Sequence, residues 1–250
     1  ELAIECVTQL DSSAAKLMGA DRIFFSGGEP TIHLPYIEQV IAEARKLSPS
    51  LKVNFDTNGY LTSASLEKVL KFTTSITYDI KAFSDEVHLA LTGVASEPVL
   101  RNAKHIGRFA KDKLWEYRIL VIPKINEEEI EPLCCFIADI DANLPVCFLA
   151  FRPNYVLEHH LGASAELMDR CVNIAKNSGL KNAYWSGQTG IYGSISALQK
   201  KIVSAYKTTG GQLAGAYAYA AGCRTHVRNC AACSSHQTCP VKRYISQIQT

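Results

Sequence analysis

The sequence lacks several features that would assign it to a particular class of protein. No apolar run reaches the roughly 18 residues of a transmembrane helix, so we expect no membrane span. The net charge is only +2 at pH 7, and this near balance gives no sign of a nucleic-acid partner or a membrane surface. No repeat or low-complexity segment occurs. The chain begins at Glu1, with neither an initiator methionine nor a targeting segment. We expect the true N-terminus to lie upstream and the protein to be cytoplasmic.

Apolar stretches with the character of strands alternate with helical patterns along most of the chain. The strand stretches are near-continuous apolar runs, as expected when both faces of a parallel sheet are buried. We predict six strands, at residues 22–26, 52–60, 75–83, 114–123, 144–153 and 182–187. The fold class is therefore α/β, and the residues alone leave open a β/α barrel or an open doubly wound sheet.

Local signals mark one helix start and the limit between two domains. Asn126 and Glu129 have the spacing of a capping box, which predicts the start of the helix after the fourth strand. Gly210 ends the last predicted helix, and a linker rich in Gly, Ala and Tyr follows it. We therefore predict a main domain over residues 1–209 and a small module over residues 210–250.

Polar residues follow the predicted strands at their carboxyl ends, where ligands bind in folds of this class. Together they suit a zwitterionic ligand, with Glu29 taking an amino group and Lys81 or Arg118 a carboxylate. Two glycines after the first strand have no Cβ, so the backbone can lie against that ligand. The alternative for any single member is an ordinary turn or surface pair. The candidate binding residues are Ser26, Gly27, Gly28, Glu29, Pro30, Asp56, Asn58, Asp79, Lys81, Arg118 and Arg152.

The motifs "SGGEPT", "DTNG" and "DIK", each after a predicted strand, resemble those of the radical S-adenosylmethionine (SAM) superfamily. The stretch "DIKAFSDEVHLALTGVASEPVLRNAKHI" resembles in particular the activating enzymes of glycyl-radical enzymes, such as the pyruvate formate-lyase activating enzymes. The resemblance covers roughly residues 1–190. It implies a partial (β/α)6 barrel of the radical SAM type. It also implies SAM and a [4Fe-4S] cluster as cofactors, with one-electron cleavage of the sulfonium giving a 5′-deoxyadenosyl radical.

The resemblance also implies roles for the residues at the strand ends. Glu29, with the backbone of the two glycines before it, would hold the methionine amino group of SAM. Lys81 and Arg118 would lie near its carboxylate or its ribose. Asp56 and Asp79 would lie near the methionine end, around a bound monovalent cation.

One motif of the superfamily is missing from the 250 residues. The family's cluster is held by a CxxxCxxC loop after the first barrel strand, and this sequence has none. Cys6 stands alone in a predicted helix and cannot replace it. We expect the strand and the loop to lie upstream of Glu1. The alternative is a relative without a cluster, which binds without radical chemistry. In neither case are the 250 residues alone expected to generate a radical.

The nine cysteines fall into two groups. Five are scattered through apolar segments, and for these we expect buried small hydrophobic side chains. They are Cys6, Cys134, Cys135, Cys147 and Cys171. The other four crowd into 17 residues near the C-terminus, which indicates a metal site or disulfides.

The second group comprises Cys223, Cys230, Cys233 and Cys239. Cys230 and Cys233 form a CxxC pair that can chelate one metal, and four thiolates select zinc or an iron–sulfur cluster. The spacing resembles, in part, the auxiliary-cluster domains of the same superfamily. We favour a second [4Fe-4S] cluster, with structural zinc or paired or free thiols as alternatives.

The function predicted from these features is that of a radical SAM enzyme. It would cleave SAM reductively and abstract a hydrogen atom from a protein, peptide or small-molecule substrate that the sequence does not identify. Flavodoxin or ferredoxin would supply the electron, with no membrane partner and no nucleic acid. The alternative is a non-catalytic SAM-binding or metal-binding module with a structural zinc site.

Overall fold

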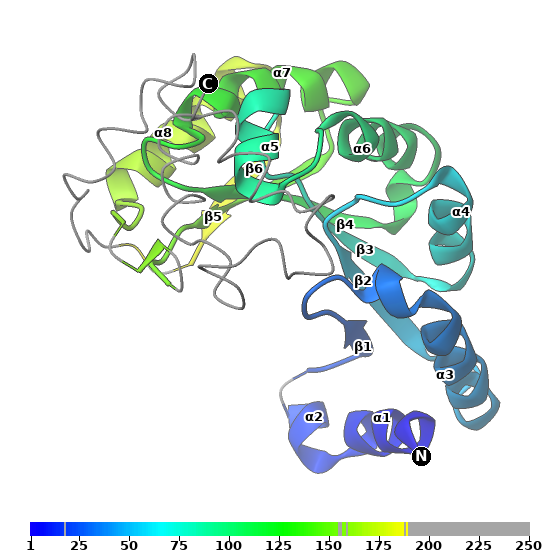
Figure 1. Cartoon of the computed structure of the whole chain (residues 1–250). Helices are drawn as coiled ribbons and strands as arrows, with labels where there is room; N and C mark the ends of the chain where they lie inside the picture. The colour runs from blue at the N-terminus through cyan, green and yellow to red at the C-terminus, as the bar shows by residue number, and fades with distance from the viewer. Residues whose placement is uncertain (18, 155–156, 159, 188, 190–250) are drawn as a thin grey trace, which may run out of the picture. The chain divides into compact units, whose positions relative to one another are not determined.

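The computed structural model describes residues 1–189, apart from 18, 155–156, 159 and 188 (Figure 1). The predicted module over residues 210–250, and with it the four clustered cysteines, lies outside the described residues. Within the described part, helices and strands alternate along the chain, as the sequence predicts.

All six predicted strands are present and form one sheet. Their order in space, β1-β2-β3-β4-β5-β6, follows their order in the chain, and the pairs that can be described are parallel. An open doubly wound sheet would reverse its strand order at one point, so that alternative is excluded. The strands are β1 Arg22–Phe25, β2 Lys52–Thr57, β3 Ser75–Asp79, β4 Leu114–Val121, β5 Pro145–Ala150 and β6 Asn182–Ser186.

The helices between the strands begin at polar caps. Thr62, Ser84 and Ser164 each accept a hydrogen bond from a backbone N–H in the first turn of the helix that they precede. The predicted helix that contains Cys6 ends at Asp11, and a second short helix begins at Ser13. The α-helices are α1 Leu2–Asp11, α2 Ser13–Leu17, α3 Leu34–Leu47, α4 Ser63–Phe72, α5 Asp85–Thr92, α6 Glu97–Phe109, α7 Ile130–Ile140 and α8 Ala165–Asn177. Among the described residues, 3-10 helices occur at η1 Pro30–His33, η2 Lys111–Lys113 and η3 Glu127–Glu129.

The chain divides into two compact units. The first comprises Glu1–Ile80 and Pro98–Arg118. Its core contains two fully buried tyrosines, Tyr78 on β3 and Tyr117 on β4, whose rings pack edge to face. Each hydroxyl donates to a carbonyl of α6, Tyr78 to Val99 at 2.7 Å and Tyr117 to Ala103 at 2.6 Å. These bonds satisfy the buried polar groups and attach α6 to the sheet.

The second unit comprises Lys81–Glu97 and the chain from Ile119 onward. In it, β5 pairs with β6, and α7 packs against α8. Its core is aliphatic and aromatic, and the fully buried members include Ile130, Leu133, Val146 and Phe148.

Two expectations from the sequence are wrong in the second unit. Asn126 and Glu129 do not form a capping box, because neither side chain caps the helix that it precedes. Cys135 is exposed on α7, whereas Cys134, Cys147 and Cys171 are buried as expected and Cys6 is half-buried. Adjacent helix positions point in different directions, and here Cys134 faces the core while Cys135 faces away from it.

The described residues contain no helix long and apolar enough to cross a membrane. They also contain no group of three or more His, Cys, Asp or Glu side chains that could hold a metal ion.

Gly59, in the loop after β2, lies directly against the ring of Tyr78. Its φ of +75° is a conformation that side-chain-bearing residues rarely adopt. A Cβ at this position would overlap the hydroxyl and ring carbons of Tyr78. Tyr78 cannot move aside easily, because it is fully buried and donates to Val99.

We therefore expect Gly59→Ala to destabilise the protein by about 2–4 kcal/mol, from an unfavourable φ and an overpacked core together. The matched control is Gly179→Ala, at a φ of +96° where a Cβ would meet no atom within 4 Å. This control changes only the backbone preference and is expected to cost about 1 kcal/mol. Urea unfolding of both variants checks the difference, and equal losses would show that the contact with Tyr78 is not limiting.

Candidate functional site

The loop between β1 and η1 carries Ser26, Gly27, Gly28 and Glu29. Both glycines of this loop have positive φ, +86° and +53°. This backbone conformation was not predicted from the sequence. A Cβ on either one would contact no atom within 4 Å. The glycines are thus required by the backbone conformation, and their outer side leaves room for a ligand to approach.

The carboxylate of Glu29 is the central acceptor of this region. Its Oε1 accepts from the Thr31 backbone N–H at 3.1 Å, the Thr31 hydroxyl at 2.8 Å and the Thr57 hydroxyl at 2.9 Å. Its Oε2 accepts from the Asn58 backbone N–H at 2.7 Å. One side chain therefore caps η1, whose first residue is Pro30, and joins the loop after β1 to the end of β2. The "SGGEPT" and "DTNG" motifs are physically connected through it.

Asp56, Ser26 and Arg118 form a second connection across the strand ends. The Ser26 hydroxyl donates to Asp56 Oδ2 at 2.9 Å, and Arg118 Nη1 lies 3.6 Å from the same oxygen. Arg118 also donates through Nε and Nη2 to Glu116 Oε1, at 3.1 and 2.9 Å. Asp79 stands opposite Arg118 in the register of β3 and β4.

Arg118 and the carboxylates around it carry a net negative charge. Partial burial opposes the charged form of Arg118, but the neighbouring carboxylates of Glu116, Asp56 and Asp79 outweigh it and raise the pKa of the guanidinium. Three carboxylates against one guanidinium leave a net charge of −2. Sequence reasoning missed Glu116, which is buried. Its position two residues before Arg118, on the same face of a strand, was the available signal.

Asn58 and Gly59 form a turn held by side chains. Asn58 Oδ1 accepts from the Tyr60 backbone N–H at 2.9 Å, which is the local turn that the sequence left open as an alternative. The buried Asn102 on α6 donates to the carbonyls of Gly59, at 3.0 Å, and Leu61, at 2.7 Å. Asn102 was not singled out from the sequence, because a lone Asn in an amphipathic helix carries no motif.

Lys81 and Arg152 belong to the second unit. Lys81 follows the end of β3 by two residues, and Arg152 follows the end of β5 by two residues and is exposed. The main chain after Lys81 is held by Asn126 and Glu129. Asn126 Nδ2 donates to the Lys81 carbonyl at 3.0 Å, and Glu129 accepts from the backbone N–H groups of Phe83 and Ser84.

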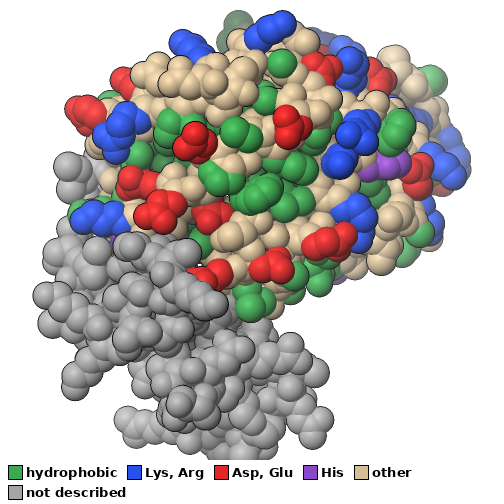
Figure 2. Space-filling view, turned by 90° about the horizontal axis from the view of Figure 1, so that it is seen from above, with side chains coloured by type: hydrophobic (Ala, Val, Ile, Leu, Met, Phe, Trp, Pro, Cys, Tyr) green, Lys and Arg blue, Asp and Glu red, His purple; other side chains and the backbone are tan. Residues whose placement is uncertain are grey.

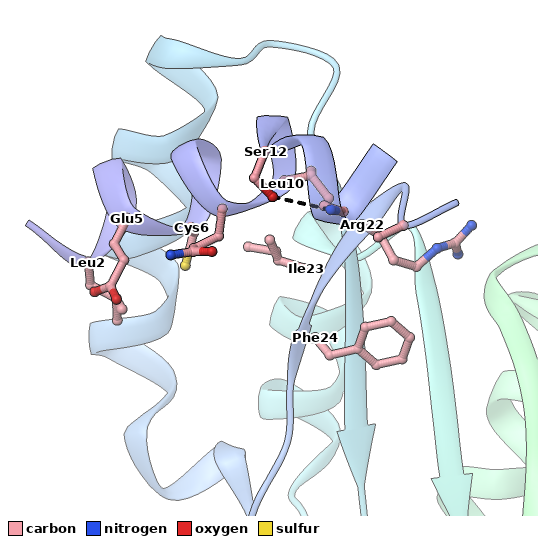
Figure 3. Close-up of a pocket in the computed structure, with 11 residues that line it drawn as sticks. Leu2, Glu5, Cys6, Leu10, Ser12, Arg22, Ile23 and Phe24 are labelled. Atoms are coloured by element: carbon pink, nitrogen blue, oxygen red, sulfur yellow. Dashed lines mark hydrogen bonds between the residues drawn. The ribbon is translucent and has the colours of Figure 1, made fainter. Parts of the chain in front are cut away.

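Two grooves open on the first unit. The larger, of about 560 Å³, lies between β1 and the helices α1 and α2, and none of the predicted binding residues lines it. Figure 3 shows Ile23 on the helix side of β1 and Phe24 on the other side. The smaller, of about 380 Å³, is lined by η1, by the segment from Tyr60 to Ser65 and by the start of α6, including Thr31, Tyr60 and Arg101. One of its lining residues, Thr31, also donates to Glu29.

Comparisons with known proteins identify the family of this chain. A family model described as the radical SAM superfamily matches residues 5–137. The chain is 28% identical over 121 residues to the trans-4-hydroxy-L-proline dehydratase activating enzyme of Clostridioides difficile, covering 44% of this chain and 39% of that protein. It is 29% identical over 102 residues to the pyruvate formate-lyase-activating enzyme of Staphylococcus aureus, covering 38% of this chain and 39% of that protein. The chain therefore matches less than half the length of these relatives.

A solved structure shows the same fold. A domain of a pyruvate-formate lyase-activating enzyme from Bacteroides vulgatus superposes with a TM-score of 0.54 at 20% identity, over 66% of this chain and 99% of that one. The likeness in structure supports the fold alone, whereas the family model covers more than half of the sequence. On that match, this chain belongs to the radical SAM superfamily.

Proposed function

We propose that this chain binds SAM at the charged strand ends of its first unit and that the whole protein is a radical SAM enzyme. The observation that carries the proposal is the bonding of Glu29, which joins the glycine loop after β1 to the loop after β2. This bonding holds both motif loops beside a group of carboxylates with net negative charge.

The charge of the group suits the charge of SAM. SAM carries an ammonium and a sulfonium against a single carboxylate, so it is a net cation. A site with three carboxylates and one guanidinium attracts such a ligand. The carbonyl groups of the positive-φ glycines and the remaining acceptor capacity of Glu29 are the proposed contacts of the ammonium.

Of the two cations expected near the SAM carboxylate, Arg118 is the one that lies in the first unit with Asp56. Arg118 already donates to Glu116 and lies beside Asp56. A guanidinium that is already shared between two carboxylates has fewer hydrogen-bond donors left for a third carboxylate. Arg118 instead keeps the neighbouring carboxylates from repelling one another, and Ser26 fixes Asp56 by its hydrogen bond.

When bound together, SAM and a [4Fe-4S] cluster supply a one-electron cleavage of the sulfonium that yields methionine and a radical able to remove a hydrogen atom. The CxxxCxxC motif does not occur in the 250 residues, and no step at the cluster is assigned to residues of this chain. The contribution of the chain is to bind SAM, orient it and keep water from the reacting atoms.

The relatives named above activate other enzymes, and the substrate that we propose is accordingly a protein, attacked at an unactivated C–H bond. The comparisons lend no support to a non-catalytic binding module. A second [4Fe-4S] cluster or zinc at the four C-terminal cysteines remains a prediction, because those residues lie outside the described part of the chain.

An electron donor of acidic character fits one face of the first unit. In Figure 2, lysine and arginine side chains gather at the right, the side on which α4 and α6 lie in Figure 1. The exposed cations of these helices and the turn after α6 are Lys68, Lys71, Arg101, Lys104, Arg108 and Lys111. We assign this face to a flavodoxin or ferredoxin, since complementary charge speeds the encounter of two proteins.

The first test is whether the complete gene product, reconstituted anaerobically with iron and sulfide, converts SAM to 5′-deoxyadenosine when reduced with dithionite. We expect cleavage in the complete product and none in the 250-residue chain alone. Chromatographic detection of 5′-deoxyadenosine measures both. SAM that remains intact in a product shown to contain a reduced [4Fe-4S] cluster would contradict the proposed reaction.

Glu29→Gln is expected to weaken SAM binding about tenfold, because an amide replaces the carboxylate that faces the ammonium. The amide NH₂ would also face the Asn58 N–H, so we expect a small fall in melting temperature. Glu43→Gln, at an exposed position on α3, is the matched control and should leave both quantities unchanged. Calorimetric titration measures the affinity, and wild-type affinity in a folded Glu29→Gln would remove Glu29 from the site.

Charge reversal on α6 tests the donor face. Lys104→Glu combined with Arg108→Glu should lower the flavodoxin-supported rate about tenfold at low ionic strength, and less at high salt. The dithionite-supported rate should not change, because dithionite needs no docking surface. Lys176→Glu, on α8 in the second unit, is the control. Equal loss with both reductants would mean that the substitutions damage the enzyme itself.

A further inference from the structure

Lys124, in the loop after β4, has a backbone conformation that lysine rarely adopts. Its φ is +60°, and every other positive φ in the described part of the chain belongs to a glycine. The Ile125 N–H donates to the Ile122 carbonyl at 3.1 Å and closes a tight turn, with Pro123 and Lys124 at its centre. Proline followed by a positive φ is the pattern of a type II turn, in which glycine or asparagine usually takes the second central position. Lysine carries a conformational cost here that glycine would avoid.

The strained turn is held from outside by two other side chains. Glu127 Oε1 accepts from the Lys124 N–H at 2.7 Å. Nε2 of the buried His160 lies 2.7 Å from the Pro123 carbonyl oxygen, which can only accept, so the ring is the donor. Backbone strain of this kind persists only where the surroundings impose it, and it is concentrated at sites that bind or react.

The Lys124 side chain is exposed, although the residues on either side of it, Pro123 and Ile125, are buried. The carboxylate that bonds its N–H, that of Glu127, also lies 3.9 Å from Arg170 on α8. In the described part of the chain, the Lys124 ammonium forms no ion pair. The strain therefore supports a side chain that points into solvent and carries a positive charge there.

A second exposed cation, Arg152, lies in the neighbouring loop of the same unit. It follows Phe151, whose N–H donates to the Val121 carbonyl at the end of β4, at 3.2 Å. The Phe151 ring also lies against that of His160, with the centroids 6.0 Å apart. The loops after β4 and β5 are thus joined to each other. Both present a cation at the carboxyl ends of their strands, where folds of this class bind ligands.

We propose that Lys124, together with Arg152, contacts an acidic segment of the protein on which this enzyme acts. The inference rests on the proposed function for the identity of the partner as a substrate protein, and it involves residues of the second unit alone. An acidic segment carries several carboxylates along its length, so one segment can reach cations on two loops. The use of its charge explains why lysine stands where glycine would fold more easily.

The binding of a fluorescently labelled hexaglutamate peptide to the complete gene product, followed by anisotropy, tests the inference. Lys124→Gly removes the charge and the strain together. It is expected to weaken binding about fivefold at low ionic strength, and less at high salt, because exposed charges are modest contributors that salt screens. It should also raise the melting temperature by about 2 °C, since the strain is relieved. Lys124→Arg keeps both charge and strain and should match the wild type.

A loss of binding in a more stable variant cannot come from misfolding, so the two readouts together are decisive. Unchanged affinity in Lys124→Gly, or no binding by the wild type at millimolar peptide, would overturn the inference. A fall in melting temperature would overturn it as well, because the lysine would then serve the fold. Arg152→Gln should weaken binding to a similar extent, and the double variant should bind more weakly than either single variant.

The cations of α4 and α6 also attract an acidic peptide, so the titration is repeated in the Lys104→Glu Arg108→Glu variant. The fivefold loss from Lys124→Gly is expected to persist there. Its disappearance would place the peptide on the donor face and contradict the inference. Lys176→Gln, at an exposed position on α8, removes the same charge from the second unit and should leave binding unchanged.

Peptide binding needs neither SAM nor a cluster, which separates this inference from the proposed function. A wild type that binds the peptide at Lys124 but does not cleave SAM would refute the proposed function, and with it the identification of the partner as a substrate. A wild type that cleaves SAM but shows no peptide binding would refute the acidic-segment site alone.

Discussion

The site depends first on one carboxylate, that of Glu29. The ends of parallel strands have no ladder to hold the loops that follow them, and a loop with two positive-φ glycines gains little from local preference. Glu29 supplies the missing constraint by accepting from Thr31, Thr57 and Asn58 at once. Charged acceptors make stronger bonds than neutral ones, so this one group can hold two loops where several amides would otherwise be needed.

The same solution recurs at the other loops of the fold. Asn102 holds the carbonyls after Gly59, Asn126 holds the carbonyl of Lys81, and Glu129 holds the N–H groups before α5. Each is a buried polar side chain that bonds main chain far away in sequence. The sheet gives the site its approximate position, and these side chains give its loops their shape.

The sequence predicts the parts of this arrangement that are local. Apolar runs predict the six strands, and the polar residues that follow them mark the ends of those strands. The sequence does not predict a side-chain contact when the partner lies far away along the chain. The spacing of Asn126 and Glu129 satisfies a local capping pattern, yet both bond to a segment about 45 residues away. Glu116 was missed although its partner Arg118 is only two residues away, because the sequence does not show that the two side chains meet beside Asp56 and Asp79. The charges at the strand ends predict a zwitterionic ligand, whereas its identification as SAM came from the resemblance to a family.

The contact between Gly59 and Tyr78 restricts the order in which this sequence can change over time. Any larger residue at Gly59 lowers the stability of the protein while the tyrosine ring is present. A smaller residue at position 78 would have to come first, and it would leave a cavity and remove the hydroxyl that donates to the carbonyl of Val99. Any lineage that takes this route passes through a less stable intermediate. Substitutions at Gly59 and Tyr78 are therefore coupled in evolution, although neither residue is charged and neither is proposed to contact the ligand.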